Sequence, residues 1–177
     1  MADNDENNNE QAPAAEAAGQ AGQENAAQFV MQRTYIKDLS FESPGAPGVF
    51  KQEWKPQMNV DLRTRSGSID DDNYEVVLTL TITAKINDET AFLIEVQQGG
   101  IFFIRGIEGE ELRRILGIVC PNMLFPYARE TIDSVAVKGT YPALMLASVN
   151  FEALYNQAVQ QSQQQAAEAE SGEAAAS

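Results

Sequence analysis

The chain has 177 residues, of which 44% are hydrophobic, and its 26 acidic and 12 basic side chains give a net charge of −14. This acidity argues against nucleic-acid binding, which depends on Lys and Arg to neutralise phosphates, and suits a basic protein partner. No apolar stretch is long enough to span a bilayer, and the acidic N-terminus does not look like a secretory signal. The single cysteine cannot form an internal disulfide, so we expect a cytoplasmic protein.

Acidic residues without basic ones mark the two ends of the chain. Residues 1–28 contain six acids and no base, and residues 156–177 contain three acids and no base. Both ends are poor in large apolar side chains, so burial there cannot offset the entropy lost on ordering. We therefore expect disordered acidic tails at 1–28 and 161–177, with one folded domain at 29–160.

Alternating apolar and polar residues predict four strands. The strongest signal is residues 74–86, and a turn at 87–90 leads into a second alternating segment at 91–98. Residues 29–42 and 58–65 alternate in the same way. The short connections favour an antiparallel sheet. In the first strand the alternation places these residues on one face: Phe29, Met31, Tyr35, Leu39 and Phe41.

Helical spacing replaces alternation in the second half of the chain. Residues 108–119 predict one helix, and we expect Cys120-Pro121-Asn122 to break it, because a residue before proline avoids helical angles. A second helix is expected from about residue 123 to 137, ended by Gly139, and a last helix capped by Asn150. The predicted fold is α+β, a four-stranded antiparallel sheet with C-terminal helices packed on one face.

The sequence offers no catalytic residue. It contains no histidine, which removes the usual activation of a Ser or Cys nucleophile and most zinc sites. Cys120 is best interpreted as a small packing residue. Asp70, Asp71 and Asp72 are either a solvated loop or a divalent-cation site, and the solvated loop is the better interpretation, so we predict no metal site.

The chain has more apolar residues than one core layer can take. Leu93, Val77 and Ile36 occupy positions that alternation assigns to a polar second face, on which we expect burial between subunits. Further large apolar residues fall in or beside connections, namely Phe50, Trp54, Phe102, Phe103, Ile104 and Tyr141. This excess also suggests an exposed groove that takes apolar segments of another chain.

Five motifs in order resemble a known family. They are YIKDLSFESPGAPGVF, YEVVLTLTITA, TAFLIEVQQGGIF, CPNMLFPYARE and NFEALY, and together they cover essentially all of residues 30–158. In these motifs the chain is similar to SecB, the protein-export chaperone family of Gram-negative bacteria. Ser148 stands where the family pattern has a proline, which affects only that turn.

The resemblance implies a binding function in which the protein catalyses no reaction. SecB-like proteins are cytosolic homotetramers, built as a dimer of dimers, that hold unfolded precursor proteins and pass them to the translocase ATPase SecA. The resemblance implies no cofactor, no enzymatic activity and no direct insertion into the membrane.

Family positions transfer to this chain residue by residue. The SecA-docking positions correspond to Asp38 and Glu42, which are four apart and so share a strand face, and to Leu93 and Glu95, which also share one. Trp54 is the strongest candidate for the client groove, and ordinary core packing is the alternative for each of its members. The groove implied by the resemblance comprises Trp54, Met58, Val60, Leu62, Phe92, Leu144 and Leu146.

Two other functions stay open at this point. A carrier of an apolar small molecule or lipid would show the same apolar excess, without an acidic docking face or a tetramer. A hydrolase using Glu108, Glu110 and Glu111 lacks any positioned acid–base pair and is disfavoured.

Overall fold

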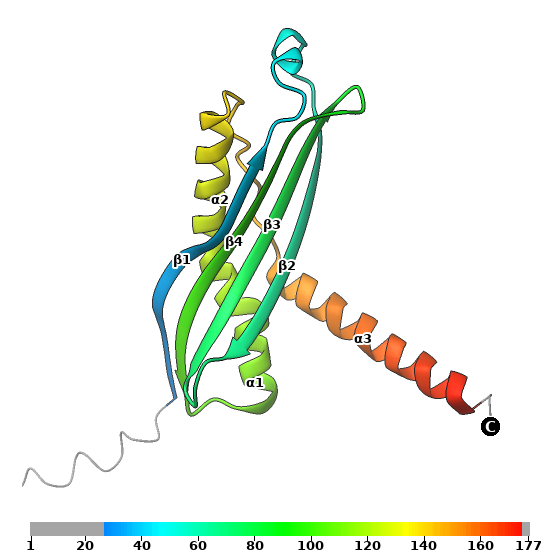
Figure 1. Cartoon of the computed structure of the whole chain (residues 1–177). Helices are drawn as coiled ribbons and strands as arrows, with labels where there is room; N and C mark the ends of the chain where they lie inside the picture. The colour runs from blue at the N-terminus through cyan, green and yellow to red at the C-terminus, as the bar shows by residue number, and fades with distance from the viewer. Residues whose placement is uncertain (1–26, 175–177) are drawn as a thin grey trace, which may run out of the picture.

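The structure, a computed structural model, describes residues 27–174, with side chains described as far as residue 165. A four-stranded antiparallel sheet forms one layer, and helices cover one of its faces (Figure 1). The predicted α+β fold is therefore confirmed. Among the described residues, none of the helices combines the length and hydropathy that crossing a bilayer requires.

The four strands are longer than alternation alone indicates. They are β1 (Gln28–Glu42), β2 (Gln57–Ser68), β3 (Asn73–Ile86) and β4 (Glu89–Arg105), arranged in the order β1-β4-β3-β2. β4 continues through Gly99 and Gly100, where the sequence pattern fades. A methyl group at Gly100 would lie 2.7 Å from the Leu124 side chain, so this glycine lets a helix lie close to the sheet.

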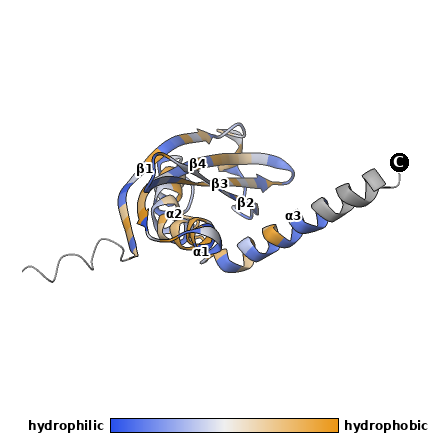
Figure 2. Cartoon of the chain, turned by 90° about the horizontal axis from the view of Figure 1, so that it is seen from below, coloured by the Kyte–Doolittle hydropathy of each residue, from blue (hydrophilic) through white to orange (hydrophobic). Residues whose placement is uncertain are grey.

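The inner face of the sheet, which the helices cover, carries the core. On β3 and β4 the even-numbered side chains from Val76 to Ile86 and from Phe92 to Val96 point inward and are buried. They pack against Cys120, Leu124 and Ala128 of the long helix. Seen along the strands, the helical segment at 109–138 lies within the curve of the sheet (Figure 2). The opposite, outer face carries the threonines and the charged side chains.

β1 departs from the predicted alternation. Its register with β4 shifts between Met31 and Arg33 and again between Ile36 and Asp38, so the strand contains two irregularities. Because each extra residue exchanges the two faces, Tyr35 lies on the outer face opposite Gly99, and Ile36 lies on the inner face. The predictions that Tyr35 shares the face of Phe29 and that Ile36 belongs to the second face are therefore wrong.

The predicted helix break at Cys120 is also wrong. Helix α1 (Gly109–Arg114) continues through a π-helical segment, η2 (Ile115–Val119), directly into helix α2 (Cys120–Lys138). A proline has no amide hydrogen, and its ring clashes with the carbonyl four residues earlier in a regular α-helix. The wider π turn immediately before Pro121 relieves this conflict without ending the helix.

The end of α2 and the start of the last helix agree with the sequence. α2 stops at Lys138 with Gly139 at its cap, where a methyl group would overlap the Phe41 ring. An extended connection at 139–150 leads to α3 (Phe151–Ala174), whose first turn is capped by Asn150 through a 2.9 Å bond from the Ala153 amide. α3 then leads away from the sheet (Figure 2).

The predicted domain boundaries fall partly outside the described residues. The predicted tail at 1–28 lies outside them except for its last two residues, and residues 175–177 lie outside them as well. The backbone of α3 crosses the predicted boundary at 160. Disorder of the two ends stays a prediction.

Candidate functional site

An aromatic cluster lies where the connection between β1 and β2 meets the inner face. Its members are Phe41, Phe50, Trp54, Phe92 and Tyr141. The connection includes a short 3₁₀ turn, η1 (Gly48–Lys51), which carries Phe50. Tyr141 is the common neighbour, with its ring centroid 4.7 Å from Phe92, 5.3 Å from Trp54 and 5.4 Å from Phe50.

Hydrogen bonds fix Tyr141 in the middle of this cluster. Its hydroxyl donates to the carbonyl of Ala91 at 2.9 Å and lies 2.6 Å from the Ser43 hydroxyl, which also donates to Ala91. A buried tyrosine whose hydroxyl is satisfied offers a rigid apolar ring. Tyr141 therefore gives the cluster an apolar ring whose polar end is hydrogen-bonded.

Exposure divides the aromatic cluster into a floor and a rim. Phe92 is fully buried, and Tyr141 is 4% exposed. Phe50 is 50% exposed, and Trp54 is half-buried. Among the predicted groove residues, Phe92 is therefore part of the core, whereas Trp54 is reachable from solvent.

β2 continues the apolar surface along the edge of the sheet. Met58, Val60 and Leu62 are paired with the buried residues Ala84, Ile82 and Leu80 of β3, so all three lie on the inner face. Even so, Met58 is 41% exposed and Val60 is 49% exposed, because the helices do not cover this edge strand. We refer to these three residues as the β2 strip.

The β2 strip ends in a groove beside α3. This groove has a volume of about 730 Å³, and it is lined by apolar side chains from β2, η2 and α3, including Leu62, Leu116, Phe151, Leu154 and Tyr155. Several contacts hold the start of α3 here, and the buried Phe151 packs against Phe125. The Tyr155 ring lies against Gly117, and Arg114 is paired with Glu152 at 2.9 Å.

The last two predicted groove residues lie in the connection at 139–150. Leu144 and Leu146 are half-buried and pack against the core, with the exposed Met145 between them. Asp133 of α2 anchors the segment, because its carboxylate accepts hydrogen bonds from the amides of Leu144 and Met145. Phe41, Phe50 and Tyr141 join the apolar surface although the predicted groove omits them, since their proximity to Trp54 depends on tertiary contacts.

The predicted docking residues come together on the outer face. Glu42 pairs with Leu93 across β1 and β4, Glu95 lies opposite Ser40, and Asp38 lies opposite Gln97. Asp38 and Glu42 are exposed, and Leu93 and Glu95 are half-buried. The shared face expected from spacing is confirmed, because both acids of β1 follow its second irregularity.

A second polar cluster lies further along the outer face. The Glu75 carboxylate accepts bonds from Lys37 Nζ at 2.6 and 2.7 Å and from the Tyr35 hydroxyl. The bonds from Lys37 and Tyr35 hold the pKa of the Glu75 carboxyl below its ordinary value. Partial burial, with the bond to Glu75, raises the pKa of Tyr35 to about 12. The Tyr35 ring covers Gly99, where a methyl group would lie 2.6 Å from the ring.

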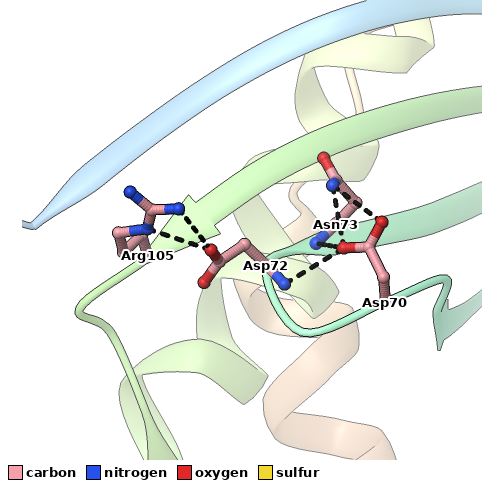
Figure 3. A network of polar contacts seen from close by, with 4 residues as sticks. All are labelled: Asp70, Asp72, Asn73 and Arg105. Carbon is pink, nitrogen blue, oxygen red and sulfur yellow. Dashed lines mark hydrogen bonds and ion pairs between the residues drawn. The ribbon is translucent and has the colours of Figure 1, made fainter.

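The acidic loop between β2 and β3 has a structural role. Asp70 accepts hydrogen bonds from the backbone of Asp72 and Asn73 and from the Asn73 side chain, and Asp72 pairs with Arg105 at 2.7 Å (Figure 3). These bonds lower the pKa of Asp70, that from the Asn73 side chain most strongly. In the described part of the chain, no three His, Cys, Asp or Glu side chains are grouped so as to hold a metal ion.

Cys120 is a packing residue. Its side chain is fully buried, and that burial raises the pKa of the thiol to about 12. A thiol with such a pKa stays protonated at neutral pH, which agrees with a packing role.

Comparison with known proteins gives one family. The family model described as preprotein translocase subunit SecB matches residues 22–162. The protein-export protein SecB of Marinobacter nauticus is 56% identical over 152 residues, covering 86% of this chain and 92% of the relative. That of Hahella chejuensis is 62% identical over 143 residues, covering 80% of this chain and 90% of the relative.

A solved structure shares the fold at low sequence identity. It is a SecB-like chaperone of Mycobacterium tuberculosis in complex with a ChAD peptide from the HigA1 antitoxin. The TM-score is 0.56 at 15% identity, covering 68% of this chain and 87% of the other. The extent of the family match and the identity to the two relatives decide the assignment, and the chain belongs to the SecB family of protein-export chaperones.

Proposed function

We propose that this chain grips unfolded precursor segments with the aromatic cluster and the β2 strip, and docks on SecA with the acids of the outer face. SecB proteins are cytosolic export chaperones without enzymatic activity that deliver precursors to SecA. The proposal assigns the two halves of that task to opposite faces of one sheet, so a bound client leaves the docking face free.

The observation that carries the client site is the half-exposed rim of the aromatic cluster. Phe50 and Trp54 lie over the buried rings of Phe92 and Tyr141, and the exposed Met58 and Val60 continue the apolar surface along β2. From Trp54 to Leu62 an extended chain covers at most about 27 Å, at roughly 3.3 Å per residue. A client segment of about eight residues therefore matches the length of this surface.

The size of the apolar surface accounts for binding without ATP. Burying roughly 1,000 Å² of apolar client surface yields on the order of 25 kcal/mol before costs. Ordering a flexible chain costs about 1–2 kcal/mol per residue, which removes most of this gain. Each site therefore holds its client with modest affinity, and several sites along one client add avidity. Clients that fold internally withdraw their apolar side chains and leave.

The assembly proposed for this chain is a homotetramer, a dimer of dimers. Strand β1 is at the edge of the sheet, and its exposed side chains include Val30, Ile36 and Leu39. Exposed apolar residues on an edge strand support pairing with a second copy. The outward side of α2 also exposes Tyr127 and Val137, which supports a second, different interface.

One pair of variants tests the two halves of the proposal. Trp54→Ala should weaken binding of a denatured precursor and leave SecA affinity unchanged, because Trp54 and Glu95 lie on opposite faces. Glu95→Lys should weaken SecA affinity and leave binding of the denatured precursor unchanged. The measurement is calorimetric binding of each variant, in the full chain, to SecA and to the unfolded precursor. Retention of a lipid with no binding of unfolded chains would favour an apolar-ligand carrier instead.

A further inference from the structure

The docking acid Glu95 lies in a depression that also holds two arginines. This depression has a volume of about 640 Å³ on the outer face, and its charged lining residues are Asp61, Arg63, Arg65 and Glu95. Its uncharged polar lining residues are Thr64, Thr79, Thr81 and Gln97. With two acids and two bases, the lining has no net charge, unlike the chain as a whole.

The register of the sheet sets the spacing of these charges. Arg65 lies opposite Val77, Arg63 opposite Thr79, and Thr81 opposite Glu95, so the three charged residues occupy three successive outward rows. Successive rows on one face are two residues, or about 7 Å, apart. A partner surface that covers Glu95 and extends over two rows and two strands therefore also covers both arginines.

The two arginines are available for contact to different degrees. Arg63 donates to Asp61 at 2.9 Å, with its side chain 80% exposed. Arg65 donates only to the neutral amide of Gln97, at 3.3 Å, and has no paired carboxylate among the described residues. The nearby Glu75 carboxylate is bonded to Lys37 and Tyr35 instead. Arg65 therefore forms no ion pair among the described residues, although its charge contributes to the lowered pKa of the nearby Glu75.

The size of a protein interface brings these arginines into the docking footprint. A standard interface covers about 800 Å² of each partner, a patch about 28 Å across. A patch of that size centred between Asp38 and Glu95 includes the rows of Arg63 and Arg65. A uniformly basic partner surface would face like charges there, which opposes binding.

We propose that the SecA surface docking here is mixed in charge, with basic side chains opposite Asp38, Glu42 and Glu95 and a carboxylate opposite Arg65 and Arg63. The inference rests on the docking function proposed above and adds the chemistry of the partner. The arginines then act as specificity residues, because a surface that carries only basic groups binds less well than one with the acid in place.

The sign of one charge reversal tests this proposal. Each variant is made in the full chain, and its affinity for the cognate SecA is measured by calorimetry at low and at physiological salt. Arg65→Gln should weaken binding about two- to fivefold, as expected for an exposed ion pair. Arg65→Glu should weaken it further, to about tenfold or more, because it places two carboxylates face to face. Both losses should shrink as salt rises.

Arg113→Glu is the matched control. Arg113 lies on α1, on the helix side of the sheet, and among the described residues its exposed side chain is paired only with Glu110, at 3.7 Å. Its reversal changes the net charge of the chain by the same amount as Arg65→Glu. The affinity of Arg113→Glu for SecA therefore measures the effect of the added negative charge on binding, separately from any contact at Arg65.

The outcomes separate this proposal from the docking function. Arg65→Glu binding as tightly as Arg113→Glu, or more tightly, would overturn the mixed-charge surface. If Glu95→Lys loses affinity for SecA in the same experiment, the proposed docking site stands and only the mixed-charge surface is overturned. Unchanged affinity in Glu95→Lys would instead overturn the docking site itself. Melting temperatures of all variants separate loss of docking from loss of folding.

Discussion

The indole of Trp54 stacks on the ring of Phe92, with ring planes 15° apart and centroids separated by 6.2 Å. Phe92 comes from β4 and is fully buried, whereas Trp54 comes from the connection before β2 and is half-exposed. The stack therefore joins the core to the surface. The outer ring can contact a client while the inner ring holds it in position.

Substituting the two rings should have different effects. Trp54→Ala should weaken precursor binding by about tenfold or more, as for other aromatic anchors, with little loss of stability. Phe92→Ala should destabilise the fold by about 3–5 kcal/mol, because it leaves a cavity beneath the cluster. Denaturant unfolding and precursor titration of both variants measure the two effects. Equal loss of stability in the two variants would show that Trp54 is simply a core residue.

The contact between Gly117 and Tyr155 should control the attachment of α3. A methyl group at Gly117 would lie 2.5 Å from Tyr155 Cδ2, so Gly117→Ala should push the start of α3 away from η2. Faster amide exchange over residues 151–158 is the expected result. Gly67→Ala on β2 is the control, since a methyl group there meets nothing within 4 Å. Unchanged exchange in Gly117→Ala would show that α3 is held by other contacts.

Burial of Cys120 predicts a loss of stability in alkali. The folded-state pKa of about 12 lies above the ordinary value of about 8.5, so the unfolded chain releases the proton first as pH rises. The stabilising contribution is complete below about pH 8.5 and disappears between there and pH 12. Cys120→Ala should show a shallower alkaline decline in the free energy of unfolding. The native thiol should also resist alkylation at pH 8 until denaturant is added.

The Glu75 cluster predicts a loss of stability in acid. The pKa of Glu75 is held below its ordinary value, so its contribution is present above about pH 4.3 and is lost as pH falls through the folded-state pKa. Glu75→Gln should cost about 0.5–1 kcal/mol at pH 7, the range of a partly exposed pair. The difference from the native chain should vanish in acid. A constant difference from pH 7 to pH 3 would contradict an ionic origin.

Alternation of apolar and polar residues predicts where the strands of this protein lie, but it does not predict for every residue which face of the sheet its side chain occupies. β3 follows the alternation, because its inner side chains from Val76 to Ile86 are buried, whereas its outer ones, apart from the buried Val77, are polar or charged. β1 does not, since its register shifts twice against β4 and Tyr35 turns outward. No residue type in 29–42 indicates where these irregularities occur. Asp38 and Glu42 keep their predicted shared face because both lie beyond them.

The helices show a comparable limit. A proline after Cys120 predicts a break from local geometry alone. The chain avoids the break by widening the preceding turn into η2, which keeps α1 and α2 continuous. That solution depends on packing. Gly117 in the same segment accepts the Tyr155 ring, a contact between residues 38 positions apart that spacing does not reveal.

The candidate site was predictable in its polar half and only partly in its apolar half. The predicted docking residues Asp38, Glu42, Leu93 and Glu95 meet because they lie on two neighbouring strands. The apolar half depends on segments distant in sequence. Tyr141 reaches Trp54 from beyond α2. Phe92, grouped with the groove by the family resemblance, is sealed beneath it.

The most direct test of the client site uses the fluorescence of Trp54, the only tryptophan in the chain. A denatured precursor without tryptophan is titrated into the full chain, and emission is followed together with binding measured independently by calorimetry. The account predicts a saturable blue shift with the same midpoint as binding, because the client removes water from the half-exposed indole. Binding of the precursor with no change in Trp54 emission would contradict it.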